Sequence, residues 1–218
     1  MIKKLQGQKA KIAILIALIV TALAEVLFRA IAVGEAALST ANAGEQITLI
    51  VLAAIILFFA AKKNDKLAYV SCGALVAYFV MDQLFELPGM IENLLANIAV
   101  PTVAISIGLR LLTMLGIVAI SALLVEYVND GSIYNRAYNI IYWATILLHV
   151  ASIAFCVVGM VLFGGSADAS NAAEFAVLQK QSMLIIFNDA YRIIMVILFT
   201  TFAYDSAKRQ LEREKLAK

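Results

Sequence analysis

The segment Ile12–Val33, IAILIALIVTALAEVLFRAIAV, decides the class of fold. It is about 22 residues long, and its only charged side chains are Glu25 and Arg29. A helix of about 20 mostly apolar residues is long enough to cross the hydrocarbon core of a bilayer. Although Ala41–Ala43 resembles a signal-peptidase site, the apolar segment is longer than the roughly 7–15 residues of a signal peptide. We therefore interpret it as a retained membrane span.

Five further apolar segments follow, and the whole chain of 218 residues is 63% hydrophobic and only 15% charged. Soluble domains average roughly 45–50% apolar and about 25% charged residues, so a soluble globule would not bury this much apolar surface. The sequence predicts an all-α, polytopic membrane bundle of about six helices in contact with a lipid bilayer. The further spans are Ile47–Ala61, Leu67–Leu87, Thr102–Tyr127, Ile140–Phe163 and Ser182–Tyr204, the last with an alternative start near Phe175.

The two prolines of the chain, Pro88 and Pro101, lie between the predicted third and fourth spans. They bracket Met90–Val100, which we interpret as a short amphipathic segment along the membrane surface. Neither proline falls inside a predicted span, so the sequence shows no sign of the broken helices that many transporters use at their binding sites.

Basic residues predict the direction of the bundle, because the cytoplasmic loops of membrane proteins are enriched in Lys and Arg. They precede the first span, follow the second, fourth and sixth spans, and leave the intervening loops acidic. This pattern predicts a multi-pass protein of the cell membrane with both termini cytoplasmic. We divide the chain into a single transmembrane bundle domain, residues 1–205, and a charged cytoplasmic tail, residues 206–218, which continues the sixth helix.

Seven charged residues lie in the predicted spans away from their cytoplasmic ends, and a charge costs at least about 2.5 kcal/mol at the bilayer centre. On each helix that carries two of them, the pair is three or four residues apart and so shares one helix face. Their positions along the spans place all seven in the outer half of the bilayer, with Asn188 beside them and Lys180 as a further cation if it is close. The predicted solute- or ion-binding residues are Glu25, Arg29, Asp82, Glu86, Arg110, Asp189 and Arg192.

Two hypotheses explain these charges. In the first, which we favour, they line a polar cavity that binds a small polar solute or cation, in a transporter or a solute-binding membrane subunit. Asp82 and Glu86 are like charges one helical turn apart, which makes them the best candidates for a cation- or proton-coupled role. In the second, the charges are structural ion pairs, such as Glu25 with Arg29, in a non-catalytic membrane subunit for assembly, anchoring or sensing.

Other residues give no indication of catalysis. One histidine, His149, and two cysteines, Cys72 and Cys156, are too few for a usual zinc, haem or iron–sulfur site. We interpret the cysteines as buried apolar residues and His149 as an interhelical hydrogen-bond partner. No nucleophile motif, phosphate loop or basic nucleic-acid-binding domain is present in the sequence. The sequence therefore predicts no enzymatic activity, no cofactor, no metal site and no nucleic-acid partner.

Small residues at helical spacing in the first span, Ala13, Ala17 and Thr21, predict a close-packing face. In architecture the chain resembles the substrate-binding membrane subunits of energy-coupling-factor vitamin importers. Those are six-helix proteins of this size with both ends inside, an Ala-x-x-x-Ala face on the first helix and a solute site near the outer surface. The resemblance implies a solute-uptake version of the transport hypothesis, and we also expect a membrane-protein partner or a homo-oligomer.

Overall fold

The computed structural model describes residues 8–33, 40–62, 64–130, 136–164 and 172–216. These residues form six α-helices and no strand, which confirms the all-α prediction. The helices are α1 (Gln8–Val33), α2 (Thr40–Ala61), α3 (Asp65–Ala96), α4 (Pro101–Asp130), α5 (Arg136–Gly164) and α6 (Ala172–Leu216).

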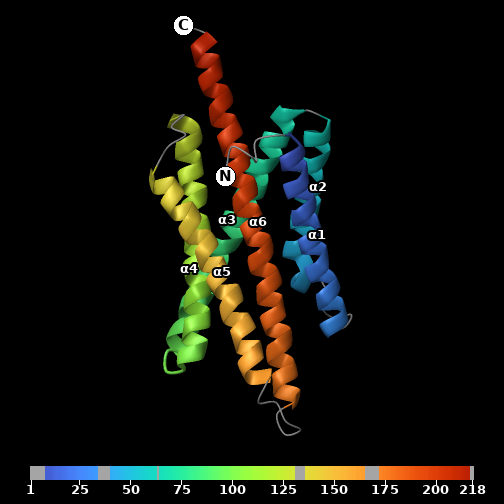
Figure 1. Cartoon of the computed structure of the whole chain (residues 1–218), viewed down its shortest axis with the longest axis vertical. Helices are drawn as coiled ribbons and strands as arrows, with labels where there is room; N and C mark the ends of the chain where they lie inside the picture. Colours follow the sequence, from blue (N-terminus) through green and yellow to red (C-terminus); the bar gives the residue numbers. More distant parts are fainter. Residues whose placement is uncertain (1–7, 34–39, 63, 131–135, 165–171, 217–218) are drawn as a thin grey trace.

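Successive helices run in opposite directions, so that α1, α3 and α5 end where α2, α4 and α6 begin (Figure 1). Each helix contains an apolar segment long enough to cross a membrane. The architecture therefore indicates a multi-pass membrane protein, while the cytoplasmic placement of both ends stays a prediction. We call the end of the bundle at which α6 begins the pocket end, because the candidate site lies there.

The central helix is α6, which packs against α1, α4 and α5 and has the most deeply buried apolar segment of the six helices. Its residues Tyr191, Met195, Leu198 and Phe199 are almost fully buried. With 45 residues the helix is about 68 Å long, so it projects beyond the bundle at the end opposite the pocket (Figure 1). The structure thus confirms both the early start of the sixth helix and its continuation into the charged tail.

The region after Pro88 differs from the sequence-based expectation. Because α3 runs without interruption from Asp65 to Ala96, Pro88 lies inside a helix, and Met90–Ala96 forms the last turns of α3. The predictions of a separate surface segment and of proline-free spans are therefore wrong. A proline removes one helical N–H donor, but in membrane helices the neighbouring structure can satisfy the freed carbonyl group and let the helix continue.

Local side-chain chemistry explains where α3 begins and ends. The Asn64 side chain accepts a hydrogen bond from the Leu67 backbone N–H at 3.4 Å, as expected of a residue that caps a helix start. At the other end, the Asn97 side-chain amide donates to the Asn93 carbonyl oxygen at 2.9 Å. The next helix starts at Pro101, where a missing N–H costs no helical hydrogen bond.

The small-residue face of α1 points away from the bundle. Ala13 and Ala17 are exposed, whereas Leu15, Leu18 and Ala22 are fully buried against the neighbouring helices. Burying leucine removes more apolar area than burying alanine, which explains the rotation of the helix. The prediction that Ala13 and Ala17 form a close-packing face is therefore wrong within this chain.

Candidate functional site

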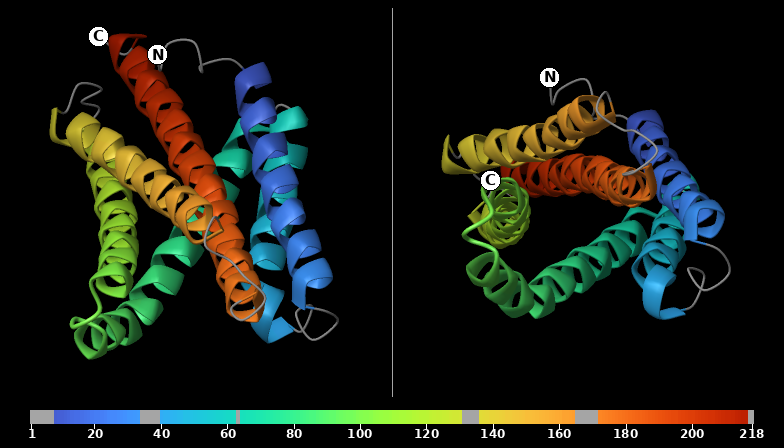
Figure 2. Two further views of the ribbon diagram at one scale, coloured as in Figure 1. Left: turned by 60° about the horizontal axis from the view of Figure 1, so that its bottom comes forward. Right: turned by 90° about the horizontal axis from the view of Figure 1, so that it is seen from below.

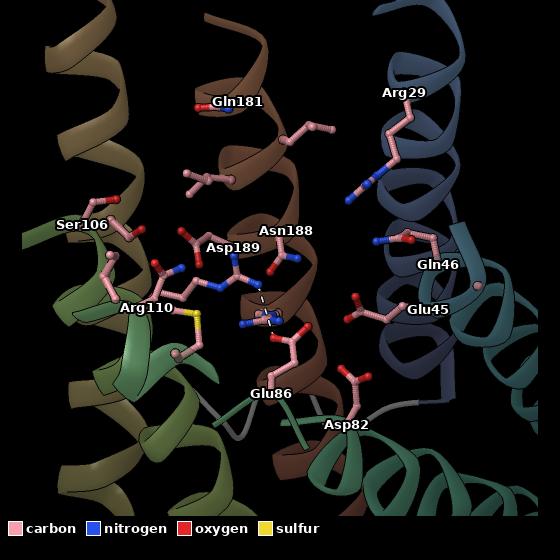
Figure 3. A pocket seen from close by; sticks show the side chains of 18 of the residues that line it. Arg29, Glu45, Gln46, Asp82, Glu86, Ser106, Arg110, Gln181, Asn188 and Asp189 are labelled. Atoms are coloured by element: carbon pink, nitrogen blue, oxygen red, sulfur yellow. Dashed lines mark hydrogen bonds and ion pairs between the residues drawn. The ribbon is translucent and has the colours of Figure 1, made fainter. Parts of the chain in front are cut away.

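A pocket of about 860 Å³ lies at the pocket end of the bundle, and all six helices contribute to its wall. That volume is within the roughly 300–1,000 Å³ of pockets that bind small molecules. Most of the side chains that line it are polar or charged, as Figure 3 shows. The polar lining residues are Arg29, Glu45, Gln46, Thr48, Tyr78, Asp82, Glu86, Asn93, Ser106, Arg110, Ser152, Gln181, Asn188, Asp189 and Arg192.

The oblique course of α3 explains why a pocket forms here. This helix packs against α2 and against α4 but touches α6 only slightly. Seen from the pocket end, it crosses from the α2 side of the bundle to α4 (Figure 2). Asp82 and Glu86 of α3 and Asn188 and Arg192 of α6 line the pocket from these two helices.

Six of the seven predicted site residues line this one pocket, namely Arg29, Asp82, Glu86, Arg110, Asp189 and Arg192. Glu25 is the exception, because it is fully buried behind the wall, where it contacts the lining residues Arg29 and Gln46. Lys180 is exposed on α6 and is not among the lining residues, so the expected extra cation does not complete the charge balance.

Glu25 and Arg29 form a buried ion pair within α1. The Glu25 carboxylate Oε1 accepts hydrogen bonds from Arg29 Nη2 at 2.7 Å and Nε at 3.0 Å. The same oxygen accepts a third hydrogen bond from Gln46 Nε2 of α2 at 3.1 Å. The second oxygen, Oε2, has no hydrogen-bond partner among the described residues. This arrangement matches the structural hypothesis for the Glu25–Arg29 pair.

A second ion pair connects α3 to α4 at the pocket wall. Arg110 Nη2 donates to Glu86 Oε2 at 3.3 Å, and the dashed line in Figure 3 marks this contact. The two side chains are 42% and 38% exposed. Water therefore competes for both charges, and the pair contributes little to stability.

The third pair is deep in the bundle and joins α5 to α6. His149 Nδ1 and Asp189 Oδ1 are 2.8 Å apart, which confirms His149 as an interhelical hydrogen-bond partner. Both side chains are almost fully buried, yet His149 Nε2 and Asp189 Oδ2 have no partner among the described residues. Asp189 lines the pocket and therefore presents an incompletely satisfied carboxylate to it.

Arg192 is a deeply buried charge of the pocket wall. Its side chain is 1% exposed, and its Nε and Nη2 atoms have no hydrogen-bond partner in the described part of the chain. The guanidinium carbon lies 5.6 Å from the centre of the Phe79 ring, close enough for a cation–π contact. That contact offsets only part of the cost of burying a guanidinium away from water.

Sequence reasoning missed the contribution of α2. The predicted second span begins at Ile47 and leaves Glu45 in a loop, whereas α2 begins at Thr40 and brings Glu45 and Gln46 to the pocket. Glu45 Oε1 accepts a hydrogen bond from the buried Tyr191 hydroxyl at 2.6 Å. The absence of proline and the helix-compatible residues before Ile47 were the available signal for a longer helix.

The cysteines and the metal-ligating residue types add no second site. Cys72 and Cys156 are buried and free, as the sequence predicts. Within the described ranges, no group of three or more His, Cys, Asp or Glu side chains is arranged to hold a metal ion. The pocket is therefore a polar cavity defined by organic side-chain groups.

Comparison with known proteins gives no relative for this chain: no protein-family model, no curated protein and no solved structure matches it.

Proposed function

We propose that this chain binds a small polar solute in its pocket, as a transporter or a solute-binding membrane subunit. The observation that carries the proposal is the pocket itself, a cavity of about 860 Å³ with charged side chains from five of the six helices. With the direction predicted by the basic residues, the pocket faces the outer half of the bilayer. A solute would then enter from outside.

The balance between paired and unpaired charges supports binding over packing alone. A structural role is sufficient for a charge that has a partner, because the pair links two positions of the bundle. Among the described residues, Asp82 has only the amide of neighbouring Gln83 as a hydrogen-bond partner, at 3.2 Å, and Arg192 has two nitrogen atoms without a partner. Apolar residues at these two positions would cost the bundle less, so a ligand is the simplest reason for such charges.

The alternative is a non-catalytic membrane subunit whose charges are structural, and one observation favours it. On the outer surface of α1, Ala13, Ile16, Ala17 and Val20 form an exposed apolar face with small residues at its centre. Such faces allow close helix packing between membrane proteins. A partner protein or a second copy on this face is compatible with either function. Solute binding in the pocket is therefore the property that distinguishes the two functions.

Thermal stability of the purified protein in lipid nanodiscs tests the proposal. Wild type and the pocket variants Asp82→Asn and Asp189→Asn are screened against a library of small polar solutes. Glu92→Gln is the matched control, because Glu92 is an exposed acid on α3 that does not line the pocket. We expect at least one solute to raise the melting temperature of wild type and of the control but not of a folded pocket variant. If no solute shifts any protein and both pocket variants melt far lower, the charges are structural.

A further inference from the structure

We propose that the solute is an organic cation whose ammonium group binds between Asp82 and Glu45, with a hydrogen-bond acceptor elsewhere on the molecule for Arg192. This inference rests on the proposed function and specifies its substrate class. Three observations support it: the net charge of the lining side chains, the hydrogen-bond partners of each carboxylate, and the buried polar atoms of the pocket wall that have no partner among the described residues.

The charged side chains that line the pocket carry more negative than positive charge. Four carboxylates line the pocket, on Glu45, Asp82, Glu86 and Asp189, together with three arginines. Arg29 is held by Glu25, which lies outside the lining, so two guanidinium groups remain against four carboxylates. Counting carboxylates and guanidinium groups alone, the formal excess is two negative charges. An excess of one sign in a cavity with low-dielectric walls concentrates solutes of the opposite sign.

The hydrogen-bond partners show where the excess lies. Glu86 forms an ion pair with Arg110, and Asp189 Oδ1 forms a hydrogen bond with His149 Nδ1. Asp82 and Glu45 are different, because neither has a Lys or Arg nitrogen within 4.0 Å among the residues that the structure describes. Glu45 has the Tyr191 hydroxyl and Asp82 has the Gln83 amide, both neutral donors.

Figure 3 shows the carboxylates of Glu45, Asp82 and Glu86 turned toward the same part of the pocket. Asp82 and Glu86 are one turn apart on α3, and Glu45 reaches them from α2. An ammonium group placed among them would make charge-assisted hydrogen bonds to carboxylates that now repel one another. Tyr78, one turn before Asp82, also lines the pocket and is an aromatic residue of the kind that interacts with cations.

Two buried and unsatisfied groups point to a ligand independently of this acidic cluster. Arg192, 1% exposed, lines the pocket, and its Nε and Nη2 atoms have no partner in the part of the chain that the structure describes, so it needs an acceptor such as a carbonyl, hydroxyl or carboxylate oxygen. Asp189, 5% exposed, also lines the pocket, and its Oδ2 atom, which has no partner among the same residues, needs a donor. A solute with an ammonium group and an oxygen acceptor satisfies these requirements together.

Size and ligand geometry favour an organic cation over a metal ion. The described residues contain no group of three or more metal-ligating side chains with suitable geometry. A cavity of about 860 Å³ is also far larger than an ion needs, since one water molecule occupies about 30 Å³ in the liquid. The pocket instead has room for a molecule with many non-hydrogen atoms.

The first test compares solutes that differ in charge. Wild type in lipid nanodiscs is screened by thermal shift against three panels: cations (polyamines, primary amines and amino-acid amides), zwitterions (free amino acids) and anions (N-acetyl amino acids). We expect stabilising compounds among the ammonium-bearing panels and none among the anions. The shift should disappear in Asp82→Asn and in Glu45→Gln, which retains a carbonyl oxygen for the Tyr191 hydroxyl, and persist in Glu92→Gln.

The second test measures the pocket charge without any knowledge of the solute. A cysteine is introduced as Ser106→Cys in a Cys72→Ala, Cys156→Ala background, because Ser106 lines the pocket. We expect a cationic methanethiosulfonate to react about tenfold faster than an anionic one, relative to a free thiol. Adding Asp82→Asn and Glu45→Gln should abolish this preference.

The outcomes separate this inference from the proposed function. Stabilisation by anions alone, or by cations equally in wild type and Asp82→Asn, overturns the cation inference and leaves solute binding intact. The inference is also wrong if the Ser106→Cys protein shows no preference for the cationic over the anionic reagent. It is wrong as well if that preference remains after both carboxylates are removed. If no compound of any panel raises the melting temperature of wild type, the inference is wrong, and the result also counts against the proposed function.

Discussion

Replacing Arg29 by glutamine tests whether the Glu25–Arg29 pair is structural. The substitution leaves the Glu25 carboxylate fully buried with a single described donor, Gln46 Nε2 at 3.1 Å, in place of three hydrogen bonds. Breaking a buried ion pair by removing one partner costs roughly 3–5 kcal/mol, since it leaves an uncompensated buried charge. For a chain of this size, that cost corresponds to a fall in melting temperature of roughly 6–20 °C.

The reverse substitution should be milder, which makes the comparison informative. In Glu25→Gln the remaining charge is Arg29, which is 22% exposed on the pocket wall and can turn toward water in the pocket. We expect Glu25→Gln to cost about 1–2 kcal/mol, the typical penalty for a lost hydrogen-bonded group. The double variant has no buried carboxylate at this position and should resemble Glu25→Gln, with a coupling energy of roughly 3–5 kcal/mol, the whole cost of Arg29→Gln.

The assay is thermal unfolding in nanodiscs, followed by intrinsic fluorescence, for wild type, both single variants and the double variant. A melting temperature of Arg29→Gln within about 2 °C of wild type would refute the structural reasoning. So would additive effects in the double variant, because two residues that act as a pair must show coupling.

Three further predictions concern residues of α4. A Cβ atom added at Gly116 would lie 2.5 Å from Oγ1 of the buried Thr145 on α5. Gly116→Ala should therefore destabilise the protein by about 1–3 kcal/mol and lower its melting temperature, and Thr145→Ala should partly restore it. Gly108→Ala on the same helix meets nothing within 4 Å, and its melting temperature should match or exceed that of wild type. In the partly exposed Glu86–Arg110 pair, Arg110→Gln should lower the free energy of unfolding by no more than about 1 kcal/mol. A much larger loss of stability in the same unfolding assay would show that the pair is buried in the membrane-embedded protein.

The sequence was sufficient to predict six apolar helices because the bilayer makes length and composition decisive. It also predicted that charges on separate helices come together, since helices that bury charged faces must turn them toward one another. The structure brings six of these seven residues to one pocket, although they come from α1, α3, α4 and α6. The interhelical role of His149 follows from the same physical requirement.

Other features could not be derived from local patterns. The tolerance of α3 for Pro88 depends on how neighbouring groups satisfy the freed carbonyl, which is a tertiary property. The outward rotation of Ala13 and Ala17 likewise depends on which α1 face buries the larger side chains against α2 and α6. Glu45 joined the pocket only because α2 begins before its apolar core, at a boundary that hydropathy defines poorly.

The pocket charges thus divide into two groups with different physical justifications. Glu25 with Arg29, and His149 with Asp189, are joined by hydrogen bonds of 2.7–3.0 Å and 2.8 Å, so each pair can be explained by its contribution to the bundle. Asp82 and Arg192 have no such partners within the described ranges, and packing alone gives no reason to keep them ionisable. Because the unpaired charges lie on opposite helices of one cavity, a solute that bridges α3 and α6 would supply both missing partners at once. Binding would then also draw together α3 and α6, which make only slight contact in the bundle, and this is the kind of coupling that a transport cycle requires.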